Sequence, residues 1–135
     1  MKTFLTKKQI EVLKRRMEGK TLEEIASEFG TTKQNISAIE RKARENYQKA
    51  LNTVKLFRSI LAPVVVRARA GMKVDDVVRD LYERCDSVNI HIPYDRFELV
   101  MLLRKEIGHR IRHSLVVEDF EIRVTKEGDV IVMPE

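Results

Sequence analysis

Hydrophobic residues near the start of the chain recur at the three- and four-residue spacing of a helix. This spacing predicts a helix over residues 7–18 with one buried stripe. Thr6 is expected to cap its start, with Gln9 as the partner in a capping box, and Gly19 is expected to end it. The residues of the predicted stripe are Ile10, Val12, Leu13 and Met17.

A second, shorter helix is predicted between Thr21 and Gly30. Thr21 and Glu24 have the spacing of another capping box, and Gly30 interrupts the helical pattern. The side chains predicted to face inward are those of Leu22, Ile25, Ala26 and Phe29.

A third helix is predicted to begin after Thr31 and Thr32, both of which are suited to capping it. Neither Gly nor Pro occurs from Thr31 until Pro63, so this helix should continue for about 30 residues. Its first apolar positions, which we expect to be buried, are Ile36, Ile39, Ala43 and Tyr47. The later ones, at a heptad-like spacing that fits either a dimer seam or packing within the same chain, are Ala50, Val54, Phe57 and Leu61.

Beyond Pro63 the pattern changes to short strands and helices. Residues 64–68 are predicted to form a strand, Gly71 a turn, and residues 74–85 a helix. Residues 88–92 alternate with period two, which predicts a strand that stops at Pro93.

The chain ends with one more helix and a hairpin. Asp95 is expected to cap a helix that contains FELVMLLRKEI, and residues 120–124 and 129–133 should pair around Gly128. We therefore predict a mainly α N-terminal helix-turn-helix bundle with a long third helix, followed by a small α+β domain in the order β-α-β-α-β-β. The predicted domains are residues 1–61 and residues 62–135.

Charge is distributed unevenly along this pattern. The chain has a formal net charge of +5. Residues 1–58 carry 14 Lys and Arg against 7 Asp and Glu, whereas residues 59–135 carry 12 against 14. A basic front half suggests a module that binds a polyanion, attached to a domain with another role.

Several protein classes are disfavoured by the sequence. The single cysteine, Cys85, cannot form an internal disulfide and fits a reducing cytosol. No apolar run reaches the length of a membrane span, so we expect a cytoplasmic protein without membrane contact. The sequence contains no phosphate-binding loop, dinucleotide fingerprint, zinc-protease motif or nucleophile elbow, so we expect no enzyme activity, no catalytic residues and no cofactor.

The front half meets the requirements of a helix-turn-helix. Ala26 is small where the helices touch, and Gly30 permits a positive φ at the turn. Polar residues suited to base edges then open the third helix: Thr31, Thr32, Lys33, Gln34, Asn35 and Ser37. Amides near Thr21, and the side chains of Arg41 and Lys42, are expected to contact phosphates. The alternative is a protein–protein adaptor that docks on transcription machinery.

The segment LTKKQIEVLKRRMEGKTLEEIASEFGTTKQNISAIERKARE resembles region 4 of bacterial sigma factors and the DNA-binding domains of response regulators. The whole chain, including GTTKQNISAIERKARENYQKA and the α+β segment that starts near APVVVRA, is similar to archaeal Tfx-type regulators. The resemblance implies a sequence-specific transcription regulator that binds double-stranded DNA. It also implies a recognition role for Thr32, Lys33, Gln34, Asn35, Ser37 and Ala38.

The rear half offers weaker signals. Apolar residues surround the helix in FELVMLLRKEI, which predicts that a partner subunit covers it and that the protein is a homodimer. The basic run RKEIGHRIRH is either a solvated helix end, an oxyanion or small-molecule effector site, or a second contact with the DNA backbone. His109 and His113, with Cys85 and His91, lack a recognised ligand spacing, so we expect no metal site.

Overall fold

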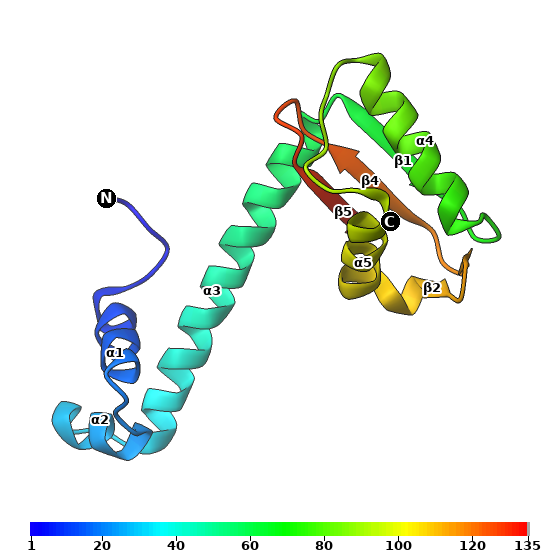
Figure 1. The fold of residues 1–135 in the computed structure, drawn as a ribbon. Helices are drawn as coiled ribbons and strands as arrows, with labels where there is room; N and C mark the ends of the chain where they lie inside the picture. The colour runs from blue at the N-terminus through cyan, green and yellow to red at the C-terminus, as the bar shows by residue number, and fades with distance from the viewer. Residues whose placement is uncertain (135) are drawn as a thin grey trace. The chain divides into compact units, whose positions relative to one another are not determined.

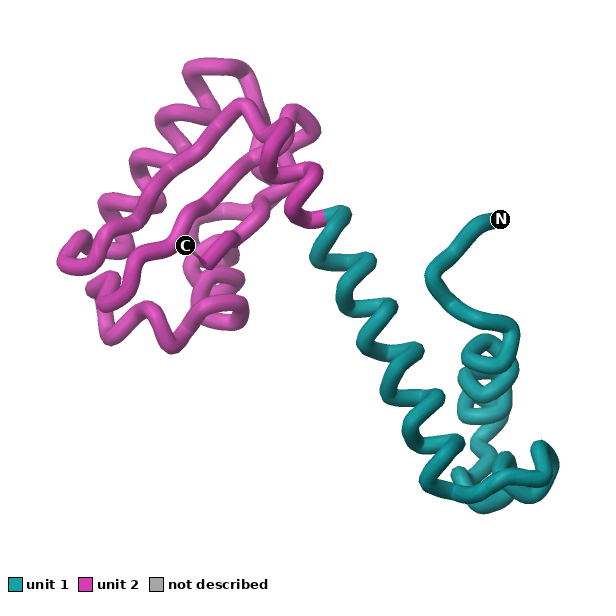
Figure 2. The backbone as a smooth tube through the Cα atoms, turned by 180° about the vertical axis from the view of Figure 1, so that it is seen from behind, with its two compact units in different colours: residues 1–54 teal, residues 55–135 magenta. Residues whose placement is uncertain are grey.

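In the computed structural model, which describes residues 1–134, the chain divides into two compact units (Figure 2). Residues 1–54 form the first unit and residues 55–135 the second, so the boundary falls inside the third helix.

The first unit contains α1 (Lys7–Met17), α2 (Leu22–Phe29) and most of α3 (Lys33–Ile60). Thr6 and Thr21 cap α1 and α2 through the predicted capping boxes. Each threonine hydroxyl accepts a hydrogen bond from the backbone N–H three residues on, and the Gln9 or Glu24 side chain accepts one from the threonine N–H. The third helix spans 28 residues, as the lack of Gly and Pro predicts.

Two of the positions predicted to be buried in this unit are exposed. Met17 and Tyr47 expose 90% and 62% of their surface. The buried line of α1 instead passes through Gln9 and Val12, because Gln9 uses its side-chain oxygen for the cap and can therefore lie inside. On α3, Ala43 is the last buried residue of the first unit, and Tyr47 lies one turn beyond it.

The second unit is an α+β domain, as predicted. Its strands are β1 (Val64–Ala68), β2 (Ile111–Arg112), β3 (Leu115–Val116), β4 (Phe120–Val124) and β5 (Val130–Pro134). Its remaining helices are α4 (Val74–Ser87) and α5 (Arg96–Ile107), and a 3-10 turn over Gly108–Arg110 follows them.

An antiparallel sheet in the order β1-β4-β5 forms the frame of this domain (Figure 1). Ile122 pairs with Val66 on one side and with Val132 on the other. Alternate residues of the strands face a single core together with α4 and α5, and Phe120 and Leu81 are completely buried there. The lone Cys85 belongs to this core, and burial raises the pKa of its thiol.

The prediction of a strand over residues 88–92 is wrong. This segment leaves α4 through a turn at Asn89, whose φ is 56°, and it pairs with no strand among the described residues. Ile90 and Ile92 are nevertheless buried in the core. An extended loop that inserts every second side chain produces the same alternation as a strand, so the pattern alone does not distinguish them.

The β4–β5 hairpin closes as predicted around Gly128, which has a φ of +94°. A short hairpin of β2 and β3, not predicted from the sequence, precedes it. None of the helices within residues 1–134 is long and apolar enough to cross a membrane.

Candidate nucleic-acid interface

A very small core holds the first unit together. Val12 of α1, Ile25 and Ala26 of α2, and Ile36 of α3 are its buried members. Leu22, Phe29 and Ile39 pack around them and remain partly exposed. Because Ala26 adds so little volume, the helices can approach closely enough to fix α3 on its neighbours.

The turn between α2 and α3 depends on Gly30. This residue has φ +64° and ψ 37°, the left-handed conformation that glycine adopts without strain. The next N–H, of Thr31, then donates to the Ala26 carbonyl at 3.0 Å and closes the end of α2. The turn directs α3 away from α2 and leaves its first residues in the open.

Three polar residues interlock where α3 begins. The Thr32 hydroxyl accepts a hydrogen bond from the Asn35 N–H at 3.0 Å, which caps the helix. The Asn35 side-chain amide in turn donates to the Thr31 hydroxyl at 3.0 Å. These two hydrogen bonds therefore stabilise the first residues of α3. The neighbouring side chains of Lys33, Gln34 and Ser37 are exposed.

Lys33 has a partner on α2. Its Nζ lies 3.0 Å from Oε1 of Glu23, and both side chains are largely exposed. The hydrogen bond from Lys33 holds the pKa of the Glu23 carboxyl below its usual value. The side chain of Lys33 is thus held near α2, but solvent screens the pair and a phosphate or base can replace Glu23.

Further along α3, the basic residues differ in how they are engaged. Arg41 is exposed and forms no ion pair within residues 1–134. Lys42 lies 3.9 Å from Glu45, whereas Arg44 pairs with Glu40 at 3.3 Å. Arg41 also lines a hollow of about 440 Å³ between the start of α2 and the α3 surface.

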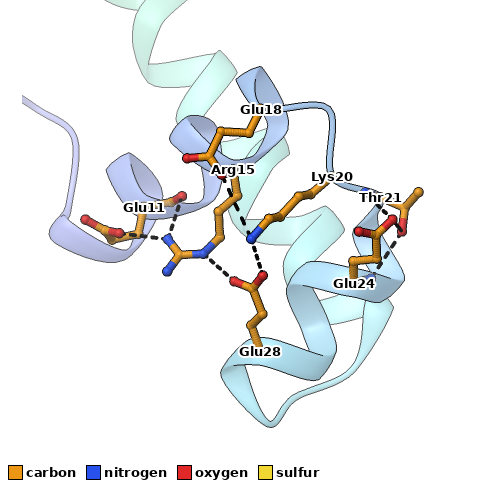
Figure 3. Close-up of polar contacts among 7 residues, drawn as sticks. All are labelled: Glu11, Arg15, Glu18, Lys20, Thr21, Glu24 and Glu28. Atoms are coloured by element: carbon orange, nitrogen blue, oxygen red, sulfur yellow. Dashed lines mark hydrogen bonds and ion pairs between the residues drawn. The ribbon is translucent and has the colours of Figure 1, made fainter.

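Other cations of the first unit serve its own structure (Figure 3). Arg15 contacts Glu11 at 2.7 Å and Glu28 at 2.6 Å, and Lys20 also binds Glu28. Hydrogen bonds from Lys20 and Arg15 lower the pKa of the Glu28 carboxyl. The side chain of Arg15 therefore joins α1 to α2, and Lys20, in the connection between the two helices, binds the same carboxylate of α2.

The structure brings the predicted site residues to one end of α3. The loop after α2 and the start of α3 contain six of them: Thr31, Thr32, Lys33, Gln34, Asn35 and Ser37. Ala38 follows them and is half-buried. Arg41 and Lys42 follow one turn later, and Thr21 caps α2 nearby. The Glu23–Lys33 pair was not predicted because it depends on how α2 and α3 meet across the turn, and the Asn35–Thr31 bond was not predicted because it depends on the conformation of the residues just before α3.

Two cations in the basic run of the second unit bind backbone carbonyl groups. Arg104 donates to the His113 carbonyl at 2.7 Å, and Arg110 donates to the Asp119 carbonyl at 2.6 Å. His109 lies in the 3-10 turn and His113 follows β2, so they share no helical face. Within residues 1–134, no group of three or more His, Cys, Asp or Glu residues is arranged to hold a metal ion.

Two protein families match the chain in succession. A model of sigma-70 region 4 matches residues 5–48, and a model of the C-terminal part of the DNA-binding protein TFX matches residues 50–132. The DNA-binding protein Tfx of Methanothermobacter thermautotrophicus is 44% identical over 131 residues, which are 97% of this chain and 95% of that protein. The chain belongs to the Tfx family.

Other Tfx relatives extend this finding. The protein named DNA-binding protein Tfx in Methanothermobacter marburgensis is 43% identical, with the same coverage of 97% and 95%. A protein of Methanocaldococcus jannaschii, provisionally named a transcriptional regulatory protein, is 37% identical over 96% of this chain and 95% of its own length. The resemblance stated from the sequence is therefore confirmed at the level of the family.

Proposed function

We propose that this protein is a transcription regulator that reads the sequence of double-stranded DNA by inserting the start of α3 into the major groove. The observation that carries the proposal is the polar, exposed opening of α3, held rigidly behind Gly30 by the core around Ile36. A helix presented in this way fits the width of the groove. The names of the Tfx relatives support DNA as the ligand.

The proposed roles follow from exposure and position. Gln34 and Lys33 are the foremost base readers, with Ser37, Thr31, Thr32 and Ala38 close to the base edges. Asn35 needs to exchange its bond to Thr31 for a bond to a base. Phosphate contacts are assigned to Thr21 at the start of α2 and to Arg41 and Lys42.

Residues 1–61 are proposed as the DNA-binding domain, and residues 62–135 as the domain that organises a homodimer or senses a small-molecule or oxyanion effector. A two-fold dimer would place two recognition helices on one palindromic site. No catalytic step is assigned to the chain, and the cytoplasm is the proposed location.

The direct test is Gln34→Ala, assayed on a duplex recovered by selection from a random-sequence library and on a scrambled duplex. Binding to the selected duplex should weaken by about 1–3 kcal/mol, with little change on the scrambled one, because Gln34 reads a base. Fluorescence anisotropy titrations measure both affinities. Gln48→Ala, also an exposed glutamine of α3 but four turns on, is the control and should change neither. Equal losses on both duplexes would remove Gln34 from the base readers. Failure of the wild-type chain to enrich any sequence would favour the alternative function, a protein–protein adaptor that docks on transcription machinery.

Arg41→Ala should weaken binding to the selected and the scrambled duplex alike. Each phosphate contact releases condensed counterions, so the slope of log affinity against log salt should fall by about one unit. Titrations across a series of salt concentrations measure the slope. Arg15→Ala, which removes a basic residue engaged in internal ion pairs, is the control. An unchanged slope with an altered sequence preference would assign Arg41 to base reading instead.

Glu23→Gln should strengthen binding to both duplexes several-fold at low salt, because it releases Lys33 from its ion pair. Glu24→Gln removes the same charge from α2, keeps a residue suited to the capping box, and leaves the Lys33 contact intact. The larger gain is expected for Glu23→Gln. Equal gains for both variants would show that the ion pair does not restrain Lys33.

A further inference from the structure

The short β2–β3 hairpin brings two cations of the second unit to one exposed face. Arg112 of β2 pairs with Leu115 of β3, and Leu115 pairs on its other side with Lys73, the residue before α4. Residues paired across antiparallel strands project their side chains to the same face. Lys73 and Arg112 therefore flank Leu115 at about 10 Å from each other, because neighbouring strands lie about 4.8 Å apart. All three residues are exposed.

A third cation reaches the same hairpin from α5. Arg104 donates a hydrogen bond to the His113 carbonyl at 2.7 Å, in the turn between β2 and β3. A guanidinium group has five N–H donors, so most of those of Arg104 remain available to another partner. We call Lys73, Arg104 and Arg112 the hairpin cations.

None of the hairpin cations forms an ion pair with another described residue. The acids Asp76 and Glu118 are engaged elsewhere, with Arg79 at 2.7 Å and with Arg110 at 3.8 Å. Like charges that are held close together without compensation repel one another and lower the stability of the folded state. A group of cations that the fold does not neutralise therefore favours an anionic ligand.

Lys73 is also unsuited to its position in the helix that it precedes. It occupies the N-cap of α4, and its side chain makes no capping hydrogen bond. Thr6, Thr21 and Asp95, by contrast, cap α1, α2 and α5 through capping boxes. A lysine cannot accept the hydrogen bond that a cap provides, and its charge lies at the positive end of the helix dipole. The presence of Lys73 therefore favours a role outside the fold.

We propose that the hairpin cations bind phosphate groups of the DNA backbone, in addition to the contacts made by the first unit. This inference rests on the proposed function, which makes double-stranded DNA the ligand. The hairpin cations are exposed and come from a strand, a helix and the residue before another helix. A small oxyanion needs donors that converge in a hollow, whereas separated cations suit a polyanion whose phosphates are neutralised one by one.

The first test uses two duplexes, one with the selected site alone and one with random flanks around the same site. Lys73→Ser/Arg112→Ala should bind the short duplex as the wild type does. On the flanked duplex it should bind more weakly, and the slope of log affinity against log salt should fall by about two units, one for each lost phosphate contact. Fluorescence anisotropy titrations over a series of salt concentrations measure affinity and slope.

Lys126→Ala is the matched control for Lys73→Ser. Lys126 is an exposed lysine of the same unit, in the turn at the other end of β4 from the hairpin. Its removal should leave the slope on the flanked duplex unchanged, whereas Lys73→Ser and Arg112→Ala should each lower it by about one unit. Equal slopes for the wild type and the double variant would overturn the proposal.

Stability distinguishes a contact with DNA from a structural role of Lys73. Lys73→Ser supplies a preferred N-cap residue, so it should stabilise α4 while it weakens binding to the flanked duplex. Peptide-resolved hydrogen exchange of residues 74–87 measures the first effect, and exchange should become slower. Faster exchange together with weaker binding would show that Lys73 acts through the fold and would overturn its assignment to DNA.

A free oxyanion is tested by calorimetric titration of the DNA-free protein with inorganic phosphate. Saturable binding that is lost in Lys73→Ser/Arg112→Ala, with an unchanged salt slope on DNA, would overturn the DNA contact in favour of a small oxyanion.

The same titrations separate this inference from the proposed function. A double variant that still prefers the selected duplex, with the wild-type slope on the flanked one, would overturn the hairpin contact and leave base reading by α3 intact. A wild type that enriches no sequence, but whose slope falls by about two units in the double variant, would refute base reading and support the hairpin contact.

Discussion

Replacement of Gly128 by alanine is expected to destabilise the second unit by about 3 kcal/mol or more. A Cβ at this position would lie 2.1 Å from the carbonyl oxygen of His91, and the backbone has a φ of +94°. The opposing atom belongs to the backbone of the loop that inserts Ile90 and Ile92 into the core, so it cannot move aside cheaply. Urea unfolding followed by circular dichroism measures the loss.

Gly71 supplies the control for this substitution. Its φ is +95°, yet a Cβ there would meet no atom within 4 Å. Gly71→Ala should therefore cost only the conformational strain, about 1–2 kcal/mol. If the two variants were equally stable, the contact with His91 would contribute nothing and the conformation alone would explain both effects.

Replacement of Ile36 by alanine should destabilise the first unit by about 2–5 kcal/mol. Ile36 is completely buried, and the core that it shares with Val12, Ile25 and Ala26 has few other members. Peptide-resolved hydrogen exchange is expected to show faster exchange throughout residues 7–43, with residues 64–134 unchanged. DNA binding should fall on all sequences, because α3 is no longer held.

Ser37→Ala is the adjacent control. Ser37 is exposed, and alanine favours the helix, so the exchange of the first unit should not increase. An effect of Ile36→Ala that spread equally over residues 64–134 would indicate that the two units unfold together.

Features that depend on neighbouring residues could be predicted from the sequence. The caps at Thr6, Thr21 and Asp95 each involve a partner three residues away, and the structure contains all three. The hairpin around Gly128 is local in the same sense. Capping residues, helix-breaking residues and the lengths between them therefore located the α-helices α1 to α5. The bounds in the structure differ from the predicted bounds by a few residues.

Features that depend on distant residues were less predictable. The period-two pattern of residues 88–92 describes burial of alternate side chains correctly, but strand pairing needs a neighbour that the pattern does not specify. Met17 and Tyr47 are apolar and in phase with their helices, yet the bundle ends before it covers them. For α5, the sequence did not indicate that one sheet suffices to bury Leu99, Leu103 and Ile107.

The candidate site shows the same division. Exposure of the polar residues that open α3 follows from helical phase relative to Ile36, which the sequence contains. The contacts of Lys33 with Glu23 and of Asn35 with Thr31 required the geometry of the turn. These contacts engage the side chains of Lys33 and Asn35. The side chain of Gln34, by contrast, forms no hydrogen bond to another residue in the described part of the chain.

The first turn of α3 separates two kinds of position that evolution can treat independently. Ile36 points into the core, while Lys33, Gln34 and Ser37 point outward and contribute little to it. Surface substitutions of this kind usually change stability by no more than about 0.5 kcal/mol. Under the proposed function, a lineage can therefore acquire a new target sequence through a few changes at these outward positions, without passing through unfolded intermediates or rebuilding the scaffold.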